Sequence, residues 1–166
     1  MERYKMGTEE KAFVELIHRY ERVIYKVCYL YTSPDATLND LYQEVLINLW
    51  RAYPQFRREC KESTWIYRIA LNTCISFLRK TKHSLETVIL TRDIDMLDED
   101  DETQQMLRQL YCLIGRLNDL EKSIILLYLD EKSYDEIAEI TGLTSTNVGT
   151  RLNRIKEKLK KMNKEN

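Results

Sequence analysis

Apolar residues recur at intervals of three and four positions through the N-terminal half of the chain, which predicts amphipathic helices. The first helix is expected to run from Thr8 to about Tyr31. A second would begin at a capping box formed by Thr37 and Asp40, because the threonine hydroxyl can accept from a free backbone N–H of the first turn. Pro54 would end this helix.

A basic loop follows and leads into a third predicted helix. The loop covers residues 57–64, and apolar positions at helical spacing then extend from Trp65 to about Lys80. Ser63 or Thr64 is the expected N-cap, since hydroxyl side chains favour that position.

The segment 81–105 has no sustained helical stripe and carries a run of acidic residues, so mutual repulsion should keep it extended and mobile. Helical spacing resumes in 107–117 and 120–129. We therefore place a domain boundary in the acidic segment.

The last part of the chain shows the pattern of a helix-turn-helix. Ser133 and Glu136 form a capping box, Gly142 can supply a left-handed turn, and Thr144 or Ser145 can cap a final helix. The expected fold class is all-α. It comprises a helical domain at residues 1–82, an acidic flexible linker at 83–105, and a helix-turn-helix domain at 106–166.

The composition is typical of a helical protein, and the distribution of charge along the chain indicates the kind of partner that it binds. The 166 residues include only four Gly and two Pro, while charged residues reach 32%. Basic residues outnumber acidic ones in 51–82 and from 144 onward, whereas acidic ones dominate 86–102. Two basic modules around an acidic tether suit a protein that touches a polyanion at two separate places.

The sequence has few residues or motifs that are typical of metal, disulfide or catalytic sites. Four widely separated cysteines and two histidines form no metal or disulfide pattern, and no nucleophile or phosphate-loop motif is present. We expect no enzyme activity, no cofactor and no metal. No stretch resembles a signal peptide or a transmembrane helix. A cytoplasmic protein with no direct membrane insertion is therefore expected.

Short donors and guanidinium groups lie along the exposed side of the last predicted helix, as readout of a DNA major groove requires. These residues are Ser145, Thr146, Asn147, Thr150, Arg151 and Arg154. The alternative for this segment is an ordinary helical hairpin with a solvated Lys-rich tail.

The N-terminal block mixes cations with aromatic rings, which suits single-stranded nucleic acid. The cations are Arg57, Arg58, Lys61 and Arg68, and the rings are Phe56, Trp65 and Tyr67. Core packing of the aromatic residues is the alternative. On the second helix, acidic and amide side chains share an exposed side near Trp50. The alternative is that this side is an ordinary solvated face and that Trp50 packs in the core.

Together these segments resemble the extracytoplasmic-function (ECF) sigma factors, the small specificity subunits of bacterial RNA polymerase. Residues 40–50 and 64–80 are similar to the second conserved region of that family. Residues 117–121, 133–138 and 148–152 are similar to its fourth region. Both motif sets occur in the family's order along nearly the whole chain.

The resemblance implies a role for each residue set. The polymerase clamp helices would bind Asp40, Gln43, Glu44, Asn48, Leu49 and Trp50. The minus-ten promoter element would be bound by Phe56, Arg57, Arg58, Lys61, Ser63, Thr64, Trp65, Tyr67, Arg68, Ile69 and Asn72. The last helix would read the minus-thirty-five element through Ser145, Thr146, Asn147, Thr150, Arg151 and Arg154.

Three further expectations follow from the same resemblance. A flipped base of the non-template strand would enter a pocket formed by Phe56, Ile69 and Asn72. The acidic run 93–102 would pass through polymerase channels otherwise occupied by nucleic acid. An anti-sigma factor is an expected partner beside polymerase core and promoter DNA.

One departure from the family pattern is Gly149, which stands where many relatives carry a cation. Tyr42 also replaces a smaller or polar residue. The leading alternative is a helix-turn-helix repressor or activator that ignores core polymerase. A third reading, a nucleic-acid-processing enzyme that binds divalent metal through the acidic run, is weak because these carboxylates lie in the predicted tether.

Overall fold

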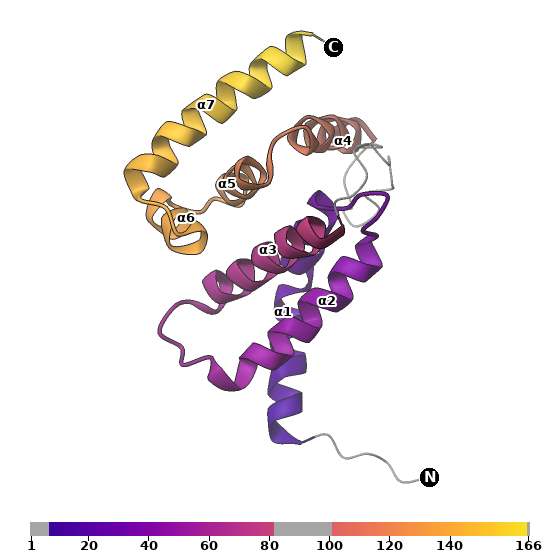
Figure 1. Ribbon diagram of the computed structural model, residues 1–166, viewed down its shortest axis with the longest axis vertical. Helices are drawn as coiled ribbons and strands as arrows, with labels where there is room; N and C mark the ends of the chain where they lie inside the picture. The colour runs from indigo at the N-terminus through magenta and orange to yellow at the C-terminus, as the bar shows by residue number, and fades with distance from the viewer. Residues whose placement is uncertain (1–6, 82–100, 166) are drawn as a thin grey trace.

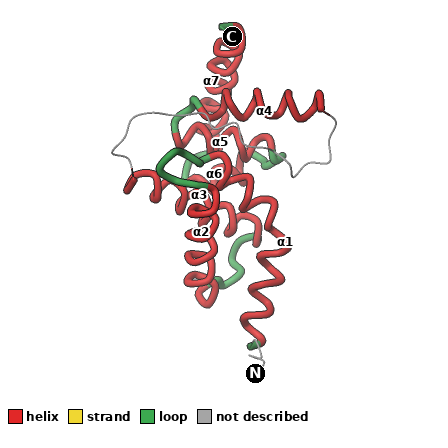
Figure 2. Tube along the Cα trace, turned by 90° about the vertical axis from the view of Figure 1, so that its right-hand side faces the viewer, coloured by secondary structure: helices red, strands yellow, loops and turns green. Residues whose placement is uncertain are grey.

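The computed structural model describes residues 7–81 and 101–165. Within these ranges every regular element is a helix, apart from an isolated bridge between Ser33 and Ala36 (Figure 1 and Figure 2). The all-α fold class is confirmed. None of the described helices has the length and apolar composition needed to span a membrane.

The N-terminal bundle contains three α-helices and one short 3-10 helix. These are α1 (Thr8–Leu30), α2 (Leu38–Ala52), η1 (Tyr53–Gln55) and α3 (Glu62–Thr81). Their apolar stripes meet in a core that includes Leu16, Ile24, Val27, Leu41, Val45, Leu49, Ile66 and Ala70. This packing buries the stripes that the sequence pattern predicts.

For α2 the Thr37 half of the predicted capping box is confirmed, and for α3 the capping prediction is wrong. The Thr37 hydroxyl accepts from the backbone N–H of Asp40. In α3, however, the Trp65 N–H already donates to the Lys61 carbonyl. Ser63 and Thr64 therefore lie inside the first turn rather than before it, where the carboxylate of Glu62 is favoured by the helix dipole.

The C-terminal bundle contains α4 (Asp101–Gly115), α5 (Asp119–Leu129), α6 (Tyr134–Thr141) and α7 (Ser145–Lys164). The last two form the predicted helix-turn-helix, and its local signals are confirmed. Ser133 and Glu136 form the capping box of α6, Gly142 ends it at φ 76°, and the Thr144 hydroxyl caps α7. Glycine suits this left-handed position because it has no Cβ.

The linker prediction needs one correction. Residues 83–100 of the expected acidic linker lie outside the described residues. Residues 101–105, also expected to be extended, form the beginning of α4. Here acidic charge favours the helix, because Glu102 lies close to the positive end of the helix dipole.

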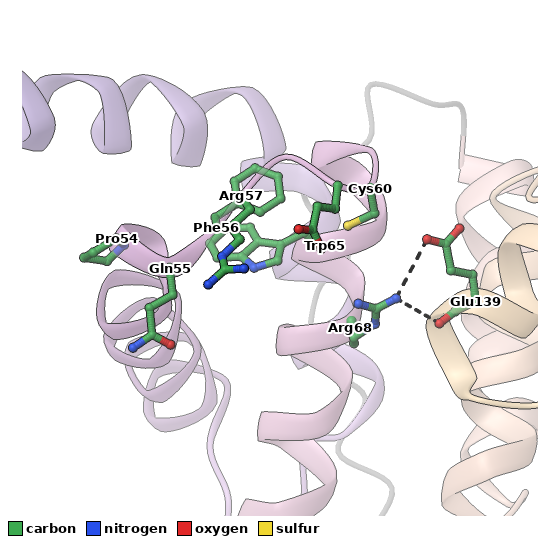
Figure 3. A pocket seen from close by; sticks show the side chains of 9 residues that line it. Pro54, Gln55, Phe56, Arg57, Cys60, Trp65, Arg68 and Glu139 are labelled. Carbon is green, nitrogen blue, oxygen red and sulfur yellow. Dashed lines mark hydrogen bonds and ion pairs between the residues drawn. The ribbon is translucent and has the colours of Figure 1, made fainter.

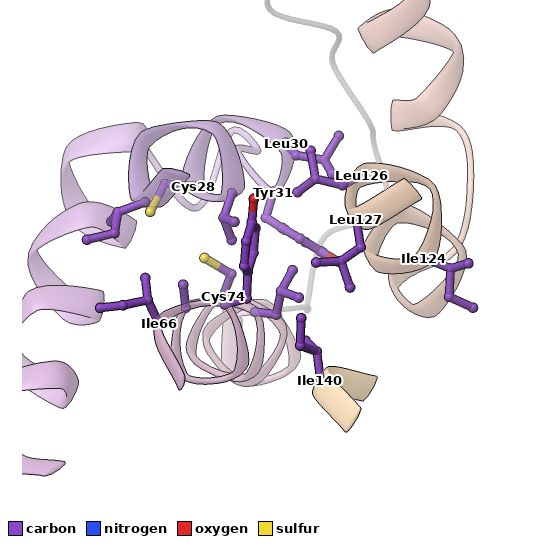
Figure 4. Close-up of a cluster of buried hydrophobic side chains, with 14 of the residues drawn as sticks. Cys28, Leu30, Tyr31, Ile66, Cys74, Ile124, Leu126, Leu127 and Ile140 are labelled. Atoms are coloured by element: carbon purple, nitrogen blue, oxygen red, sulfur yellow. The ribbon is translucent and has the colours of Figure 1, made fainter. Parts of the chain in front are cut away.

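The two bundles pack against each other mainly through α3 and α6, with a smaller contact between α1 and α4 (Figure 1). Figure 4 shows the buried cluster at this junction, with Tyr31 close to Leu126 and Leu127. The Tyr31 hydroxyl lies 2.7 Å from both the Ser123 Oγ and the carbonyl oxygen of Asp119. The junction thus contains apolar contacts and a satisfied buried hydroxyl.

Candidate nucleic-acid interfaces

The loop between α2 and α3 borders an open cleft of about 780 Å³ (Figure 3). Phe56 and Trp65 stack at this cleft with ring centroids 4.6 Å apart and 24° between the ring planes. Arg57 and Arg68 line the same space. An aromatic surface beside guanidinium groups can bind a base and its phosphate together.

The predicted minus-ten residues differ widely in exposure. Arg57, Arg58, Lys61 and Asn72 are exposed; Phe56, Ser63, Arg68 and Ile69 are half-buried; Thr64, Trp65 and Tyr67 are buried. Trp65 is 8% exposed and belongs to the core, as the packing alternative for the aromatic residues anticipated. The exposed members are therefore the ones that a DNA strand could reach directly.

The expected three-residue base pocket is not assembled in this structure. Phe56 lines the cleft beside Trp65, whereas Ile69 and Asn72 line a separate cavity of about 350 Å³ between α2 and α3. Arg68 lines the cleft and the next residue, Ile69, lines the cavity, because successive side chains of a helix point about 100° apart. The stacked rings and the α3 surface are thus two distinct sites.

Two cations of the basic segment are paired with α6. The Lys61 ammonium lies 2.9 Å from the Glu136 carboxylate. The Arg68 guanidinium donates to the backbone carbonyl of Glu139 at 3.0 Å and lies 4.0 Å from its carboxylate. A backbone N–H bond from Ser133, with help from Lys61, lowers the pKa of the Glu136 carboxyl to about 2. Glu136 is consequently charged at neutral pH.

A third polar contact lies deeper in the same junction. The Tyr67 hydroxyl donates to Asp130, which also pairs with the Lys26 ammonium from α1. Burial, together with the bond to Asp130, raises the pKa of the Tyr67 hydroxyl far above its ordinary value. Tyr67 therefore remains a neutral donor.

Helix α7 separates its packing side from its candidate DNA-reading side. Val148, Leu152 and Ile155 are buried. All the predicted minus-thirty-five residues lie on the exposed or half-buried remainder, namely Ser145, Thr146, Asn147, Thr150, Arg151 and Arg154. Asn147 Oδ1 accepts from Arg151 Nε at 2.7 Å, so this guanidinium is held in a defined direction.

Gly149 has a packing role that the sequence did not reveal. A Cβ at this position would lie 3.3 Å from a ring carbon of Tyr134 at the start of α6. The tyrosine ring therefore lies against the backbone of the last helix. A side chain at position 149 would therefore have to displace this ring slightly.

The exposed side of α2 forms the third candidate surface. Asp40, Gln43 and Trp50 are exposed, and Glu44 and Asn48 are half-buried. Trp50 is 41% exposed and packs edge-on against Phe13. The remaining predicted contact residue, Leu49, is fully buried in the bundle core. Its position on the apolar stripe of α2 accounts for that burial.

Sequence reasoning missed the acidic side of the junction between the bundles. Glu136 was recognised only as a capping residue, and neither Asp130 nor Glu139 was singled out. Each bonds to a residue more than sixty positions away along the chain. No local sequence signal marks such pairs.

Comparisons with known proteins agree on both halves of the chain. The family model described as sigma-70 region 2 matches residues 16–84, and that described as sigma-70, region 4 matches residues 107–159. SigW, an ECF RNA polymerase sigma factor of Bacillus subtilis, is 30% identical and the match covers 92% of this chain and 89% of SigW. The ECF sigma-E factor of Haemophilus influenzae is 29% identical, with 95% and 89% coverage.

Two solved structures have a similar fold. The sigma factor RpoE of Bartonella quintana, in complex with the anti-sigma factor NepR, gives a TM-score of 0.75 at 18% identity and covers 93% of this chain and 98% of its own. CnrH, in complex with the cytosolic domain of CnrY, gives a TM-score of 0.68 at 20% identity, with 94% and 90% coverage.

Proposed function

Because the chain belongs to the ECF sigma factors, we propose that it directs the core of bacterial RNA polymerase to a subset of promoters and helps to melt them. The observation that carries this proposal is the presence of both sigma-70 regions, in order, on one chain. Each region presents a separate candidate surface for nucleic acid. The protein would act as a non-enzymatic subunit in the cytoplasm, where that polymerase works.

The exposed side of α2 is the proposed contact with polymerase core. Asp40, Gln43 and Glu44 supply carboxylate and amide groups there, and Trp50 offers a large half-exposed ring. An aromatic anchor surrounded by polar groups is typical of binding hot spots. Leu49 would support this surface from the core, as it is fully buried.

The basic loop and the start of α3 are the proposed minus-ten site. Arg57, Arg58 and Lys61 can bind phosphates, and the half-buried Phe56, supported from below by the buried Trp65, offers an apolar wall for an unstacked base. The exposed amide of Asn72 would contact the melted strand further along α3. Thr64 and Tyr67 would support the site from the core.

Helix α7 is the proposed reader of the minus-thirty-five element. Thr146, Asn147 and Thr150 lie in its first two turns, where a recognition helix contacts base edges. Arg151 and Arg154 add groups for bases or phosphates. We also propose an anti-sigma factor as a partner, supported by the similar structure of RpoE, which was solved in complex with the anti-sigma factor NepR.

A run-off transcription assay with purified core polymerase tests the function. Promoters are first selected from a random DNA pool by the reconstituted holoenzyme. We expect transcripts only when the protein is added. Absence of any transcript dependent on it would reject the proposal. A repressor or activator would instead bind duplex DNA alone and fail to retain core polymerase in a pull-down.

The α2 surface allows a sharper version of that pull-down. The variant Asp40→Asn/Glu44→Gln removes two carboxylates without changing side-chain size, and it should weaken polymerase binding by roughly a factor of ten. The matched control Glu9→Gln/Glu165→Gln changes the net charge equally at exposed sites outside α2. Equal binding by the two variants would remove α2 from the interface.

A further inference from the structure

Two exposed tyrosines and a lysine lie close together on the surface of the C-terminal bundle. Tyr128 belongs to the last turn of α5, Tyr134 begins α6 and Lys156 lies in α7, so each comes from a different helix (Figure 1). The two tyrosines are 37% and 42% exposed, although aromatic rings of this size are more often buried. We call these three residues the tyrosine-lysine cluster.

The lysine ammonium is held in a defined place. Lys156 Nζ donates to the Tyr128 hydroxyl at 3.0 Å and lies 4.1 Å from the centroid of its ring. The Tyr134 ring lies against α7 at Gly149, which precedes Lys156 by about two helical turns on the same side of the helix. The bond to Tyr128 raises the pKa of the Lys156 ammonium, and the nearby Tyr134 adds to this shift. Lys156 is therefore charged at neutral pH.

No carboxylate neutralises this charge, in contrast to two nearby lysines of the same helix. Lys158 pairs with Glu121. Lys160 pairs with Glu157. In the part of the chain that the structure describes, Lys156 makes no ion pair, and its ammonium keeps two N–H groups besides the one bonded to the tyrosine.

The tyrosine hydroxyls add further donors to this charge. The Tyr128 hydroxyl accepts from Lys156 and can still donate its own proton. Among the described residues, the Tyr134 hydroxyl has no hydrogen-bond partner. A cation surrounded by hydroxyl donors suits the oxygen atoms of a phosphate group.

The cluster also lies where the backbone of duplex DNA would pass. A helix with its side chains is about 10–12 Å wide and the major groove about 12 Å, so the two flanks of a recognition helix face the two phosphate backbones. Gly149 and Lys156 lie on one flank of α7, outside the side that carries proposed base contacts such as Thr150. The first helix of a helix-turn-helix crosses the DNA backbone, and Tyr134 begins that helix.

We propose that the tyrosine-lysine cluster binds one phosphate of the DNA backbone beside the minus-thirty-five element. Lys156 supplies the charge, and the two tyrosine hydroxyls orient the phosphate oxygens. Such a contact fixes the register of α7 on the duplex without reading a base. The proposal rests on the proposed function of α7 and adds three residues to it.

Single substitutions on one helix separate this contact from the general charge of the bundle. Lys156→Met removes the ammonium and keeps a flexible apolar side chain over the Tyr128 ring. The matched control Lys164→Met removes the same charge at an exposed position near the end of α7. Tyr134→Phe removes only the free hydroxyl. Thermal unfolding first verifies that all three variants are folded.

The first measurement is binding of the full chain, without polymerase, to a labelled duplex of mixed sequence. Fluorescence anisotropy follows the association constant between about 50 and 200 mM salt. Loss of one phosphate contact in Lys156→Met should lower the slope of its logarithm against the logarithm of salt concentration by about 0.9. Lys164→Met should change the slope much less. Equal changes in the two lysine variants, or a wild type that binds no duplex at the lowest salt, would overturn the site.

The second measurement locates the phosphate. A promoter selected by the holoenzyme is synthesised with one neutral methylphosphonate at each position in and beside the minus-thirty-five element. One such change should weaken binding of the wild-type holoenzyme by about three- to tenfold and leave that of Lys156→Met unaffected. Tyr134→Phe should show a reduced effect at the same position, and Lys164→Met the full effect. A scan that gave the same profile for the wild type and Lys156→Met would overturn the site.

These outcomes are distinguishable from a failure of the proposed function. A lowered salt slope for Lys156→Met without any transcript dependent on the protein would reject the function and retain the phosphate site. Transcripts together with an unchanged slope would reject the site alone. If Lys156→Met bound DNA normally but no longer retained core polymerase, the cluster would be a protein contact, and the proposed phosphate site would be wrong.

Discussion

Helices α3 and α7 are both twenty residues long and both carry proposed DNA contacts, but they divide packing and recognition differently. In α7 the buried stripe is separate from the proposed contacts. In α3 the proposed set includes Trp65 and Tyr67, which are buried. A substitution in α7 can therefore report on DNA binding alone, whereas one in α3 often changes the bundle core as well.

The largest expected effect separates the two tryptophans of the N-terminal bundle. Trp65→Ala removes a ring that is 8% exposed and stacked on Phe56, so it should lower the free energy of unfolding by about 3–4 kcal/mol. Trp50→Ala removes a ring that is 41% exposed and should cost less than about 1.5 kcal/mol. Urea unfolding of both variants gives the comparison.

For binding to polymerase, we expect the larger loss in Trp50→Ala and the smaller loss in Trp65→Ala. Trp50→Ala is expected to reduce retention of core polymerase, while remaining folded at the temperature of the assay. Equal losses of stability in the two tryptophan variants would contradict the assignment of Trp65 to the core and Trp50 to a surface.

The next effect tests whether α7 separates binding from stability. Arg154→Ala should weaken holoenzyme binding to a selected promoter by about 1–3 kcal/mol if the side chain reads a base, or lower the salt slope by about one unit if it binds phosphate. Stability should stay within about 0.5 kcal/mol, because the residue is exposed. The control Lys164→Ala, near the end of the helix, should leave both quantities nearly unchanged.

Binding assays across a range of salt concentrations distinguish these roles. If Arg154→Ala and Lys164→Ala had the same effect, α7 would act only through its overall positive charge. A large loss of stability in Arg154→Ala would instead place this side chain in the packing of the bundle.

The same contrast explains how much of the structure the sequence could predict. The Ser133 cap, the Gly142 turn and a cap at Thr144 or Ser145 were predicted correctly, because caps and left-handed turns depend on residue type and local spacing. The start of α3 was missed because Ser63 and Thr64 suit a cap but also tolerate a first turn. The sequence did not indicate that the two predicted helical domains pack against each other.

The junction between the bundles was beyond sequence reasoning for a physical reason. Tyr67 and Asp130 are 63 positions apart, and their bond depends on how two complete bundles dock. Surface carboxylates such as Glu139 have the same local pattern whether they face water or a cation. Only the assembled fold shows which of them is paired.

A smaller effect concerns the close contact between the two helices of the helix-turn-helix. Gly149→Ala should raise the free energy of unfolding by roughly 0.5 kcal/mol, since alanine favours a helix by about 1 kcal/mol and the Tyr134 ring must move slightly. Tyr134 is 42% exposed, so it has room to shift. Thermal unfolding of the single variant and of Gly149→Ala/Tyr134→Ala measures both contributions. A loss of stability in the single variant only would show that the ring is fixed.

The smallest expected effect is a dependence of the free energy of unfolding on pH. It arises from Glu136, which caps a helix of the C-terminal bundle and also pairs with Lys61 across the junction. The pKa of the Glu136 carboxyl is about 2 in the folded chain, below its ordinary value of 4.5. The unfolded chain therefore binds more protons between these values, and the stabilisation is complete above about pH 5 and lost as the pH falls toward 2. Glu136→Gln should remove this dependence while keeping the cap.

Unfolding temperatures of the wild type and Glu136→Gln, measured from pH 7 to pH 2, isolate that contribution. Because solvent screens the pair with Lys61, we expect a gap of about a few tenths of a kcal/mol at pH 7 that closes in acid. Lys61→Met, which removes the cation and leaves the Ser133 N–H bond, should retain part of the pH dependence. A gap that widened as the pH fell would mean that Glu136 is stabilised in its protonated form, and the charge pairing across the two bundles would have to be abandoned.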